Sequence, residues 1–477
     1  MLPNDVLLEI FDFVLDTLWR NTWHRLAHVC QKWRKIVFSA PHRLNLELMC
    51  KDGKPVRNTL YVWPPLPIKM CYYGTHKLSG YAKSVFGDEV DNIIAALEHK
   101  DRICELTLFN APSSEMEEML AAMHEPFPAL IALNLRPKST FAYAPVVRVF
   151  DSFLGGSAPR LRTLRLDHIL LPFLGLQKLL LSASGLNSLH LTNIPDSAYF
   201  SPDAIVTCLS ASTRLEDLQI TFKSSRSRPV RESRHPPPLT LILLPALTSL
   251  TFKGVSEYLE DLVAQIDTPR LQALSITFFH QLFFHTPQLS RLISRAPRLK
   301  GYDEARVTFT CRGAKVTLRL PLSRGSIGHE ISVGISCKRP DLQHQSLVQL
   351  CTSSFPQSII PAVKHLYLEY EEELWEDDWV NSTRSDIPNS QWLQVLHPFI
   401  AVKNMYIFEK IAPLIAPALQ ELVGERVTEV LPALECLFLD GLGASGSVRD
   451  AILPFIDARL LSTHPVVASY WDCDDED

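Results

Sequence analysis

A triplet of apolar residues with spacings of three and then two positions recurs along this chain of 477 residues, and it constrains the fold more than any other feature. Leucine, which fills most of these positions, accounts for 72 of the 477 residues. The seven starts from Ile103 to Leu271 are separated by 27, 31, 25, 29, 32 and 24 residues. Such self-similarity predicts a stack of similar short units. The six leucine-based copies are Leu130-Leu133-Leu135, Leu161-Leu164-Leu166, Leu186-Leu189-Leu191, Leu215-Leu218-Ile220, Leu247-Leu250-Phe252 and Leu271-Leu274-Ile276. The four conservative variants are Ile103-Leu106-Leu108, Val363-Leu366-Leu368, Val402-Met405-Ile407 and Leu434-Leu437-Leu439.

The triplet resembles the L-x-x-L-x-L strand signature of leucine-rich repeats. The resemblance implies that each triplet points inward from a short parallel strand and that a helix follows each strand. Helix-start patterns stand between the triplets, because Ser201-Pro202 and Thr286-Pro287 each place a capping residue before a proline, and Ser114 with Glu117 forms a capping box. The asparagine or cysteine that the family has at the ninth position is replaced here by Ile169, Ile194, Val255 and Phe279. We therefore expect irregular turns and curvature.

An interruption lies between Leu299 and Val363, where residues 306–337 alternate between apolar and polar types. This period is typical of half-buried antiparallel strands, so a small hairpin or meander is predicted inside the repeat array. The predicted fold class is α/β: a small helical N-terminal domain, then an irregular leucine-rich-repeat solenoid with parallel strands on its concave face, helices on its convex face and this antiparallel insertion.

The first fifty residues carry a different pattern. Apolar residues recur with a helical period at Val6, Leu7, Ile10, Phe11 and Val14. A second helical stripe runs from Leu26 to Val37, and Pro41 ends it. Two or three short helices are predicted, and so small a bundle buries little area alone.

This segment resembles an F-box over roughly residues 2 to 46. The resemblance is carried by Leu2-Pro3, Val6-Leu7, Ile10-Phe11 and Val29-Cys30-x-x-Trp33-Arg34. The stretch from Asp16 to Arg25 is longer than in the family and lacks the Asp-Leu start of the second helix. With the repeats behind it, the whole chain resembles a fungal leucine-rich F-box protein.

The F-box resemblance implies docking onto the small Skp-family adaptor, and through it onto a cullin scaffold of a ubiquitin ligase. The helices would lie in a groove of the adaptor. The residues expected to contact the adaptor are Leu2, Pro3, Leu7, Ile10 and Phe11. Val29, Cys30 and Trp33 are expected in the core of the helical bundle. The alternative is that these helices only cap the repeats.

The predicted domains follow from these patterns. They are the F-box at 1–46, a connecting segment with a first helical unit at 47–98, the solenoid at 99–460 with its insertion near 306–337, and an acidic C-terminal tail at 461–477.

Two charged segments interrupt the repeats. Six carboxylates between Glu371 and Asp378 surround Trp375, which fits either a solvated loop or a docking edge for a basic target. The candidate target-binding residues there are Trp375, Glu376, Asp377, Asp378 and Trp379. The basic, proline-rich segment from Lys223 to Pro238 fits an inter-repeat insertion, a contact for an acidic partner or a phosphorylatable serine cluster.

Composition narrows the partners and the compartment. Lys and Arg number 47 against 52 Asp and Glu, a net charge of −5, which predicts neither a nucleic acid nor a membrane as partner. The 10 cysteines form no C-x-x-C pair, so free thiols are expected, as in intracellular proteins. The N-terminus lacks the pattern of a signal peptide. We therefore expect a cytoplasmic or nuclear protein.

Motifs for catalysis, phosphate binding or zinc are not found in the sequence, so no cofactor, metal or enzymatic activity is predicted. His280 and His285 are expected to be partly buried core histidines. The favoured function is a non-enzymatic substrate receptor of a Skp–cullin–F-box ubiquitin ligase, in which the solenoid binds a protein target that the sequence does not identify. The alternative is a leucine-rich-repeat interaction scaffold without a ubiquitin role; an enzyme with an unrecognised pocket is a third, less favoured, hypothesis.

Overall fold

The computed structural model describes residues 3–17, 23–39, 46–50, 56–63, 65–74, 86–138, 146–226, 241–320, 329–371, 387–440 and 446–471. The chain divides into two compact units. The first holds residues 1–200 and 207–215, and the second holds residues 201–206 and 216–477.

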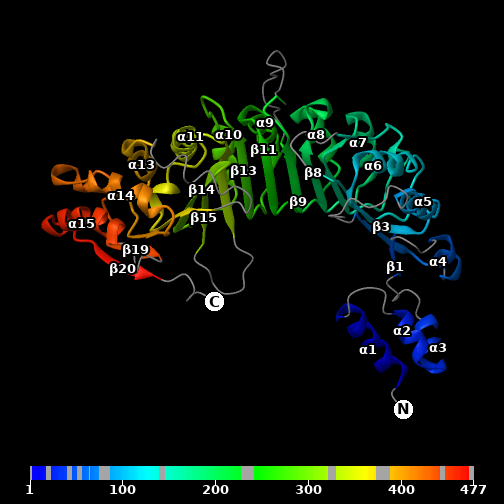
Figure 1. The fold of residues 1–477 in the computed structure, drawn as a ribbon. Helices are drawn as coiled ribbons and strands as arrows, with labels where there is room; N and C mark the ends of the chain where they lie inside the picture. The colour runs from blue at the N-terminus through cyan, green and yellow to red at the C-terminus, as the bar shows by residue number, and fades with distance from the viewer. Residues whose placement is uncertain are drawn as a thin grey trace. The chain divides into compact units, whose positions relative to one another are not determined.

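Three helices open the chain (Figure 1) and pack against one another: α1 (Asn4–Thr17), α2 (Trp23–Val29) and α3 (Gln31–Ser39). We call them the helical head. The helix α1 begins directly after Pro3, whose carbonyl accepts a hydrogen bond from the amide of Leu7 at 3.1 Å. Proline suits this place because the first amides of a helix lack partners within the helix. The head therefore contains the three short helices that the N-terminal pattern predicted.

The rest of the first unit alternates strands and helices. Its sheet is parallel, in the order β1-β2-β3-β4-β6-β8. The strands are β1 (Leu46–Met49), β2 (Ile68–Tyr73), β3 (Ile103–Ala111), β4 (Ala132–Pro137), β6 (Thr163–Asp167) and β8 (Ser188–Ile194). The helices are α4 (Val56–Val62), α5 (Phe86–Leu97), α6 (Ser113–Ala121) and α7 (Phe173–Ser182), with the 3-10 turns η2 (Phe153–Gly156) and η3 (Asp196–Ala198). The short strands β5 (Val147–Arg148) and β7 (Ile169–Leu170) form a separate parallel pair.

The second unit continues the same alternation. Its sheet has the order β9-β11-β13-β16-β15-β14-β17-β18-β19-β20. The strands are β9 (Asp217–Phe222), β11 (Ser249–Gly254), β13 (Ala273–Phe279), β14 (Glu304–Thr310), β15 (Gly313–Arg319), β16 (Glu330–Ser336), β17 (His365–Tyr370), β18 (Asn404–Ile407), β19 (Cys436–Asp440) and β20 (Val467–Trp471), with a separate parallel pair β10 (Ile242–Leu243) and β12 (Ile266–Asp267). The helices are α9 (Ser256–Val263), α10 (Pro287–Arg295), α11 (Pro340–Ser353), α13 (Asn389–Leu396), α14 (Ala412–Gln420) and α15 (Gly446–Leu461), with η5 (Ile360–Ala362) and η6 (Gly424–Thr428); α8 (Pro202–Leu209) lies where the chain passes from the first unit to the second.

The predicted triplets form the core of both units. All thirty triplet residues are buried, none more than 5% exposed. Parallel pairing places triplets opposite one another, as in Leu133 opposite Leu164 and Leu250 opposite Leu274. Because side chains alternate along a strand, the residues between the triplet positions lie on the other face, which we call the open face. In each unit the helices cover the triplet face (Figure 1), so the predicted α/β repeat fold is confirmed.

Near the ends of three strands of the first unit, one residue adopts the left-handed backbone conformation. Asn110, His168 and Asn193 have φ of 62°, 56° and 51°, and each stands one position before the ninth residue of its repeat. This conformation is uncommon for residues other than glycine and is enriched for Asn and His. The irregular turns and curvature expected from the missing asparagine stay a prediction.

Helix starts are capped in more ways than the sequence indicated. Ser201 caps α8, because its hydroxyl accepts the amide of Ala204 at 3.3 Å. The predicted box at Ser114 is wrong, since α6 begins at Ser113 and has no side-chain cap. The start of α10 is capped from the neighbouring helix, where both carboxylate oxygens of Glu260 accept amides, from Gln288 at 2.8 Å and Leu289 at 2.9 Å. Tertiary contacts therefore supply caps that local sequence does not contain.

The predicted insertion is a three-stranded antiparallel meander, β14-β15-β16. It joins the main sheet, because β16 pairs in parallel with β13 and β14 pairs in parallel with β17. The two outer strands of a three-stranded meander run in the same direction, so both can continue a parallel sheet, which a two-stranded hairpin could not do. Of the two predicted forms, hairpin or meander, the structure contains the meander.

The sheet extends further than predicted at both ends. The segment 47–98, expected to be a connection with a first helical unit, contains the helices α4 and α5 and also contributes strands, since β1 and β2 pair in parallel with each other and β2 pairs with β3. The segment 461–477, expected to be a tail, contributes β20, which pairs with β19. These strands escaped prediction because their apolar residues alternate without the leucine triplet, as in Ile68, Met70 and Tyr72. Residues 472–477 of the acidic tail lie outside the described residues.

Replacing a triplet leucine should destabilise the second unit. Leu250 is fully buried at 0% exposure, so Leu250→Ala removes buried methyl groups and leaves a cavity, which costs about 2–5 kcal/mol. Thr251→Ala, one position along the same strand on the open face, is the matched control and should cost far less. Urea unfolding followed by circular dichroism measures both changes, and equal losses would contradict the assignment of the two faces.

The buried His344 should make the fold sensitive to acid. It stacks on Phe309 at a centroid distance of 4.5 Å, and its Nδ1 donates to the carbonyl of Pro340 at 2.8 Å. Burial lowers the pKa of His344 to about 4, whereas an unfolded histidine titrates near about 6.5. The unfolded chain therefore binds a proton first as the pH falls, and the stability present above pH ~6.5 is lost between ~6.5 and ~4.

Between pH 7.5 and 5 this group should lower the free energy of unfolding by about 2 kcal/mol. In His344→Gln the dependence on pH should be smaller by that amount, as measured by urea unfolding at both values. An unchanged dependence would show that His344 is protonated equally in both states.

Candidate functional site

The helix α1 is apolar on two faces. On one face Leu7 and Phe11 are buried, 4% and 3% exposed. On the other face Val6, Ile10 and Phe13 are 39%, 38% and 69% exposed. A helix that packs on one side only normally has a polar outer face. The second apolar face is therefore the unusual feature of this helix.

The inner face of α1 holds the head together. Phe11 packs against Trp33 of α3 with ring centroids 4.8 Å apart. The other buried apolar side chains of the head are Leu26, Ala27, Ile36 and Val37. Leu7 and Phe11, predicted to contact an adaptor, are thus core residues of the head, because a bundle of three short helices needs its largest side chains inside.

The junction between α2 and α3 corrects a second prediction. Val29 is 59% exposed and Cys30 is exposed, so neither lies in the core as predicted. Cys30 stands directly before α3, and its Sγ accepts the amide of Trp33 at 3.4 Å. This is the place of a helix N-cap, three residues before the amide that it binds. The cysteine of the Val-Cys-x-x-Trp-Arg motif is therefore a cap, and Trp33 is the half-buried partner of Phe11.

The outer face of α1 forms a stripe that we call the outer stripe: Pro3, Val6, Ile10 and Phe13. Spacings of three, four and three residues place these side chains on one side of a helix. Val29 and Phe38 add exposed apolar surface on α2 and α3. The sequence predicted Pro3 and Ile10 as adaptor contacts but not Val6 and Phe13, although this spacing distinguishes all four from Leu7 and Phe11. Leu2 lies outside the described residues.

The open face of the first unit carries paired charges and aromatic rings. Lys69 and Glu105 on β2 and β3 form an ion pair at 2.8 Å. The guanidinium of Arg136 lies 5.2 Å from the ring centroid of Phe109 and 3.2 Å from the carboxylate of Asp167, which also accepts a bond from Asn193 at 2.7 Å. Cross-strand pairs of this kind stabilise the sheet and fix the positions of side chains that stay partly exposed.

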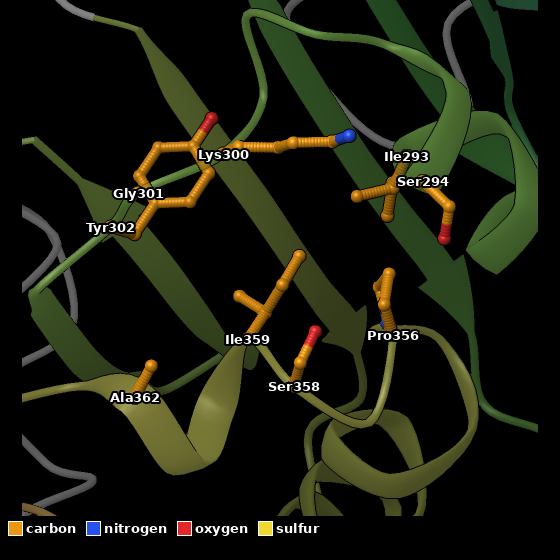
Figure 2. A pocket seen from close by; sticks show the side chains of 9 residues that line it. All are labelled: Ile293, Ser294, Lys300, Gly301, Tyr302, Pro356, Ser358, Ile359 and Ala362. Carbon is orange, nitrogen blue, oxygen red and sulfur yellow. The ribbon is translucent and has the colours of Figure 1, made fainter.

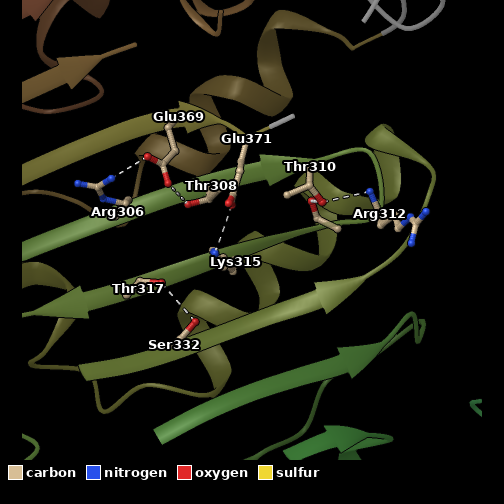
Figure 3. Close-up of polar contacts among 10 residues, drawn as sticks. Arg306, Thr308, Thr310, Arg312, Lys315, Thr317, Ser332, Glu369 and Glu371 are labelled. Carbon is tan, nitrogen blue, oxygen red and sulfur yellow. Dashed lines mark hydrogen bonds and ion pairs between the residues drawn. The ribbon is translucent and has the colours of Figure 1, made fainter. Parts of the chain in front are cut away.

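The open face of the second unit has a denser polar network around the meander (Figure 3). Glu369 of β17 accepts bonds from Arg306 at 2.8 Å and from Thr308 at 2.6 Å. Beside them Lys315 pairs with Glu371 at 3.6 Å, and Thr317 donates to Ser332 at 3.2 Å. Polar groups that satisfy one another on packed strands form a rigid surface.

Two carboxyl groups near the start of the meander differ in their surroundings. Burial, together with the nearby Asp303, raises the pKa of Glu304, which lies across from Arg319 and His365 in the strand register. Burial opposes the charged form of a carboxyl group. The neighbouring Glu330 is paired with Arg319 at 3.0 Å.

A cavity of about 330 Å³ opens between the end of α10 and the segment before β17 (Figure 2). Its walls are mainly apolar, with Ile293, Pro356 and Ile359, and Lys300 extends along it. Tyr302 also lines it; its hydroxyl has no hydrogen-bond partner, and burial raises the pKa of this group. The nine lining residues include no histidine, cysteine or carboxylate.

Other predicted sites are reported within the described ranges only. There, no three histidine, cysteine or acidic side chains converge as a metal site would require. None of the helices described here is both long and apolar enough to cross a bilayer. The candidate target-binding residues Trp375 to Trp379 lie outside the described residues, as does most of the basic segment from Lys223 to Pro238.

Two comparisons with known proteins find similarities. Residues 1–43 match the family model described as F-box-like. The chain is also similar to a solved structure, the leucine-rich repeat-containing protein LegL7 from Legionella pneumophila, at 10% identity and a TM-score of 0.27, with 90% of this chain and 91% of that chain covered. Among curated proteins no match is found. The head of this chain is therefore similar to F-box domains.

Proposed function

We propose that this chain is a non-enzymatic substrate receptor of a Skp–cullin–F-box ubiquitin ligase. In this proposal the head binds a Skp-family adaptor, and through it a cullin scaffold, while the repeat sheet binds a protein target. The transfer of ubiquitin would then take place elsewhere in the assembly. The receptor would act by holding the target at a fixed place, which raises its effective concentration at the transferring enzyme.

The observation that carries the proposal is the outer stripe on a segment that matches the F-box-like family. Val6, Ile10 and Phe13 are exposed on a helix whose other face already forms the core. An amphipathic helix laid into a groove is a common mode of recognition. Central apolar anchors of such an interface contribute about 2 kcal/mol or more each. The stripe is thus the place where the family's adaptor would dock.

The sheet supports the second half of the proposal. Its triplet face is covered by helices, whereas the open face is not. Paired side chains such as Arg306 and Glu369 hold that face in a defined arrangement. Exposed polar and aromatic groups on a rigid scaffold are typical of protein recognition. The fungal type and the cytoplasmic or nuclear location indicated by the sequence remain predictions.

Polar substitution of the outer stripe should abolish adaptor binding without unfolding the head. In Val6→Asp with Ile10→Asp, two exposed anchors would be charged and desolvated in the interface. The affinity for a Skp-family adaptor should fall by at least about 100-fold, measured by pull-down and by calorimetry. Circular dichroism should stay unchanged, since neither residue is buried.

The matched control is Leu282→Asp with Phe283→Asp, a pair that is 79% and 82% exposed in the repeat region and should bind the adaptor normally. Undiminished binding by the stripe variant would refute the interface. If the unaltered chain binds no Skp-family adaptor, the alternative applies: an interaction scaffold whose head serves as a cap.

A further inference from the structure

Two adjacent large apolar side chains are exposed in the segment between β13 and α10. Leu282 is 79% exposed and Phe283 is 82% exposed. Their chain neighbours Gln281 and Phe284 are buried, at 8% and 6% exposure. We call Leu282 and Phe283 the apolar tip. A pair of this kind, exposed between two buried residues, is a candidate contact surface.

Contacts on either side hold the apolar tip in place. The side-chain carbonyl of Gln281 accepts the amide of Ser256 at 3.0 Å, and its side-chain amide donates to Glu257 at 2.6 Å. The ring of Phe284 packs on Phe278 with centroids 5.7 Å apart. A segment held in this way loses little conformational freedom when it binds. The tip itself can be altered without removing the contacts that hold the segment.

The strand ends around the tip carry an excess of basic residues. The strands β9, β11, β13 and β16 are parallel neighbours in that order, so their carboxyl ends share one rim that is about 15 Å long. The turn at Arg312 adjoins this rim, because its carbonyl accepts the amide of Cys337 at 2.8 Å. We call the six basic residues there the basic rim: Lys223, Arg226, Lys253, Arg312, Lys338 and Arg339.

The acidic residues among the same strand ends are Glu257, Glu260 and Asp341, and each has a partner within the chain. Glu257 accepts the bond from Gln281, and Glu260 accepts the first amides of α10. Asp341 pairs with Arg339 at 2.6 Å. Six basic groups thus stand against three carboxylates, and a partner that approaches the tip meets an excess of positive charge.

The arrangement of these groups fits an extended anionic surface. The basic residues are distributed over several strand ends, whereas a single acidic side chain would need them gathered around one point. Binding of a peripheral protein to a bilayer increases with the apolar area that enters the interface and with the attraction of basic residues to anionic headgroups. The net charge of −5 predicts no membrane partner, but screening beyond about 8 Å makes the local charge decisive.

We infer that the apolar tip inserts into the headgroup region of an anionic lipid bilayer and that the basic rim contacts the lipid headgroups. The contact is peripheral, since only two side chains enter the bilayer. It goes beyond the proposed function, because it involves neither the head nor an adaptor. Its effect would be to concentrate the receptor at a membrane surface, where the repeat sheet meets the targets present there.

Sedimentation with lipid vesicles tests the inference, using the full chain at neutral pH without any adaptor. Vesicles of phosphatidylcholine with about 30% phosphatidylserine should bind the chain at about 0.1 M salt. Vesicles of phosphatidylcholine alone should bind it at least about 10-fold more weakly, because each basic residue near an anionic surface contributes a factor of about five. In Phe283→Trp, the fluorescence of the new side chain should shift to shorter wavelength when the anionic vesicles are added.

Leu282→Ser with Phe283→Ser should weaken binding to the anionic vesicles by at least about 10-fold, because the apolar area that enters the interface is lost. Lys338→Glu, which reverses one exposed charge of the basic rim, should also weaken it. The matched control is Leu460→Ser with Leu461→Ser, an adjacent pair that is 59% and 92% exposed at the end of α15, and it should bind as the unaltered chain does. Urea unfolding should be the same for all of these variants.

Three results would overturn the inference. The first is no binding to the anionic vesicles, which would leave a protein as the partner of the tip. The second is equal binding to both kinds of vesicle. The third is equal affinity of the tip variant and the unaltered chain, or an equal loss in the control variant. Because the adaptor is absent, failure here is distinct from failure of the head to bind it.

Discussion

The burial of one apolar triplet per repeat is the interaction on which the rest of the structure depends. Each strand alone has too little apolar surface to fold, and only stacking with the neighbouring repeats removes its triplet from water. Because side chains alternate, a register slip of one residue would place every triplet on the wrong face. The same alternation leaves the intervening residues uncovered. An exposed polar and aromatic surface therefore follows from the packing of the core.

The head differs from the repeats, because it has more apolar surface than its three helices bury. Three short helices enclose Leu7 and Phe11 but leave Val6, Ile10 and Phe13 on the far side of α1 39%, 38% and 69% exposed. Exposed apolar patches on small domains mark interaction sites. The similarity of residues 1–43 to F-box domains gives that patch its most direct interpretation, an adaptor interface.

Sequence patterns predicted the repeating features and missed those that depend on contacts between distant residues. The triplets located ten strands because their spacing repeats, and the alternation after Leu299 located the meander. The Val-Cys-x-x-Trp-Arg motif predicted Cys30 in the core, because the sequence alone does not show that its Sγ caps α3. The stacked rings of Tyr367, Tyr406 and Phe438 belong to residues 39 and 32 positions apart, so only the strand register brings them together. The spacing along α1 separates Leu7 and Phe11 from Val6, Ile10 and Phe13, but only the packing of the head shows which of the two sets is buried.

Hydrogen–deuterium exchange of the full chain, with and without a Skp-family adaptor, tests the central claim most directly. If the head binds the adaptor and the repeat sheet binds a different partner, the adaptor should contact the head alone. Exchange should then become slower within residues 4–39 on adaptor binding and stay unchanged in the strands from β3 to β20. Protection of the strands with an unaltered head, or no change anywhere in the chain, would contradict it.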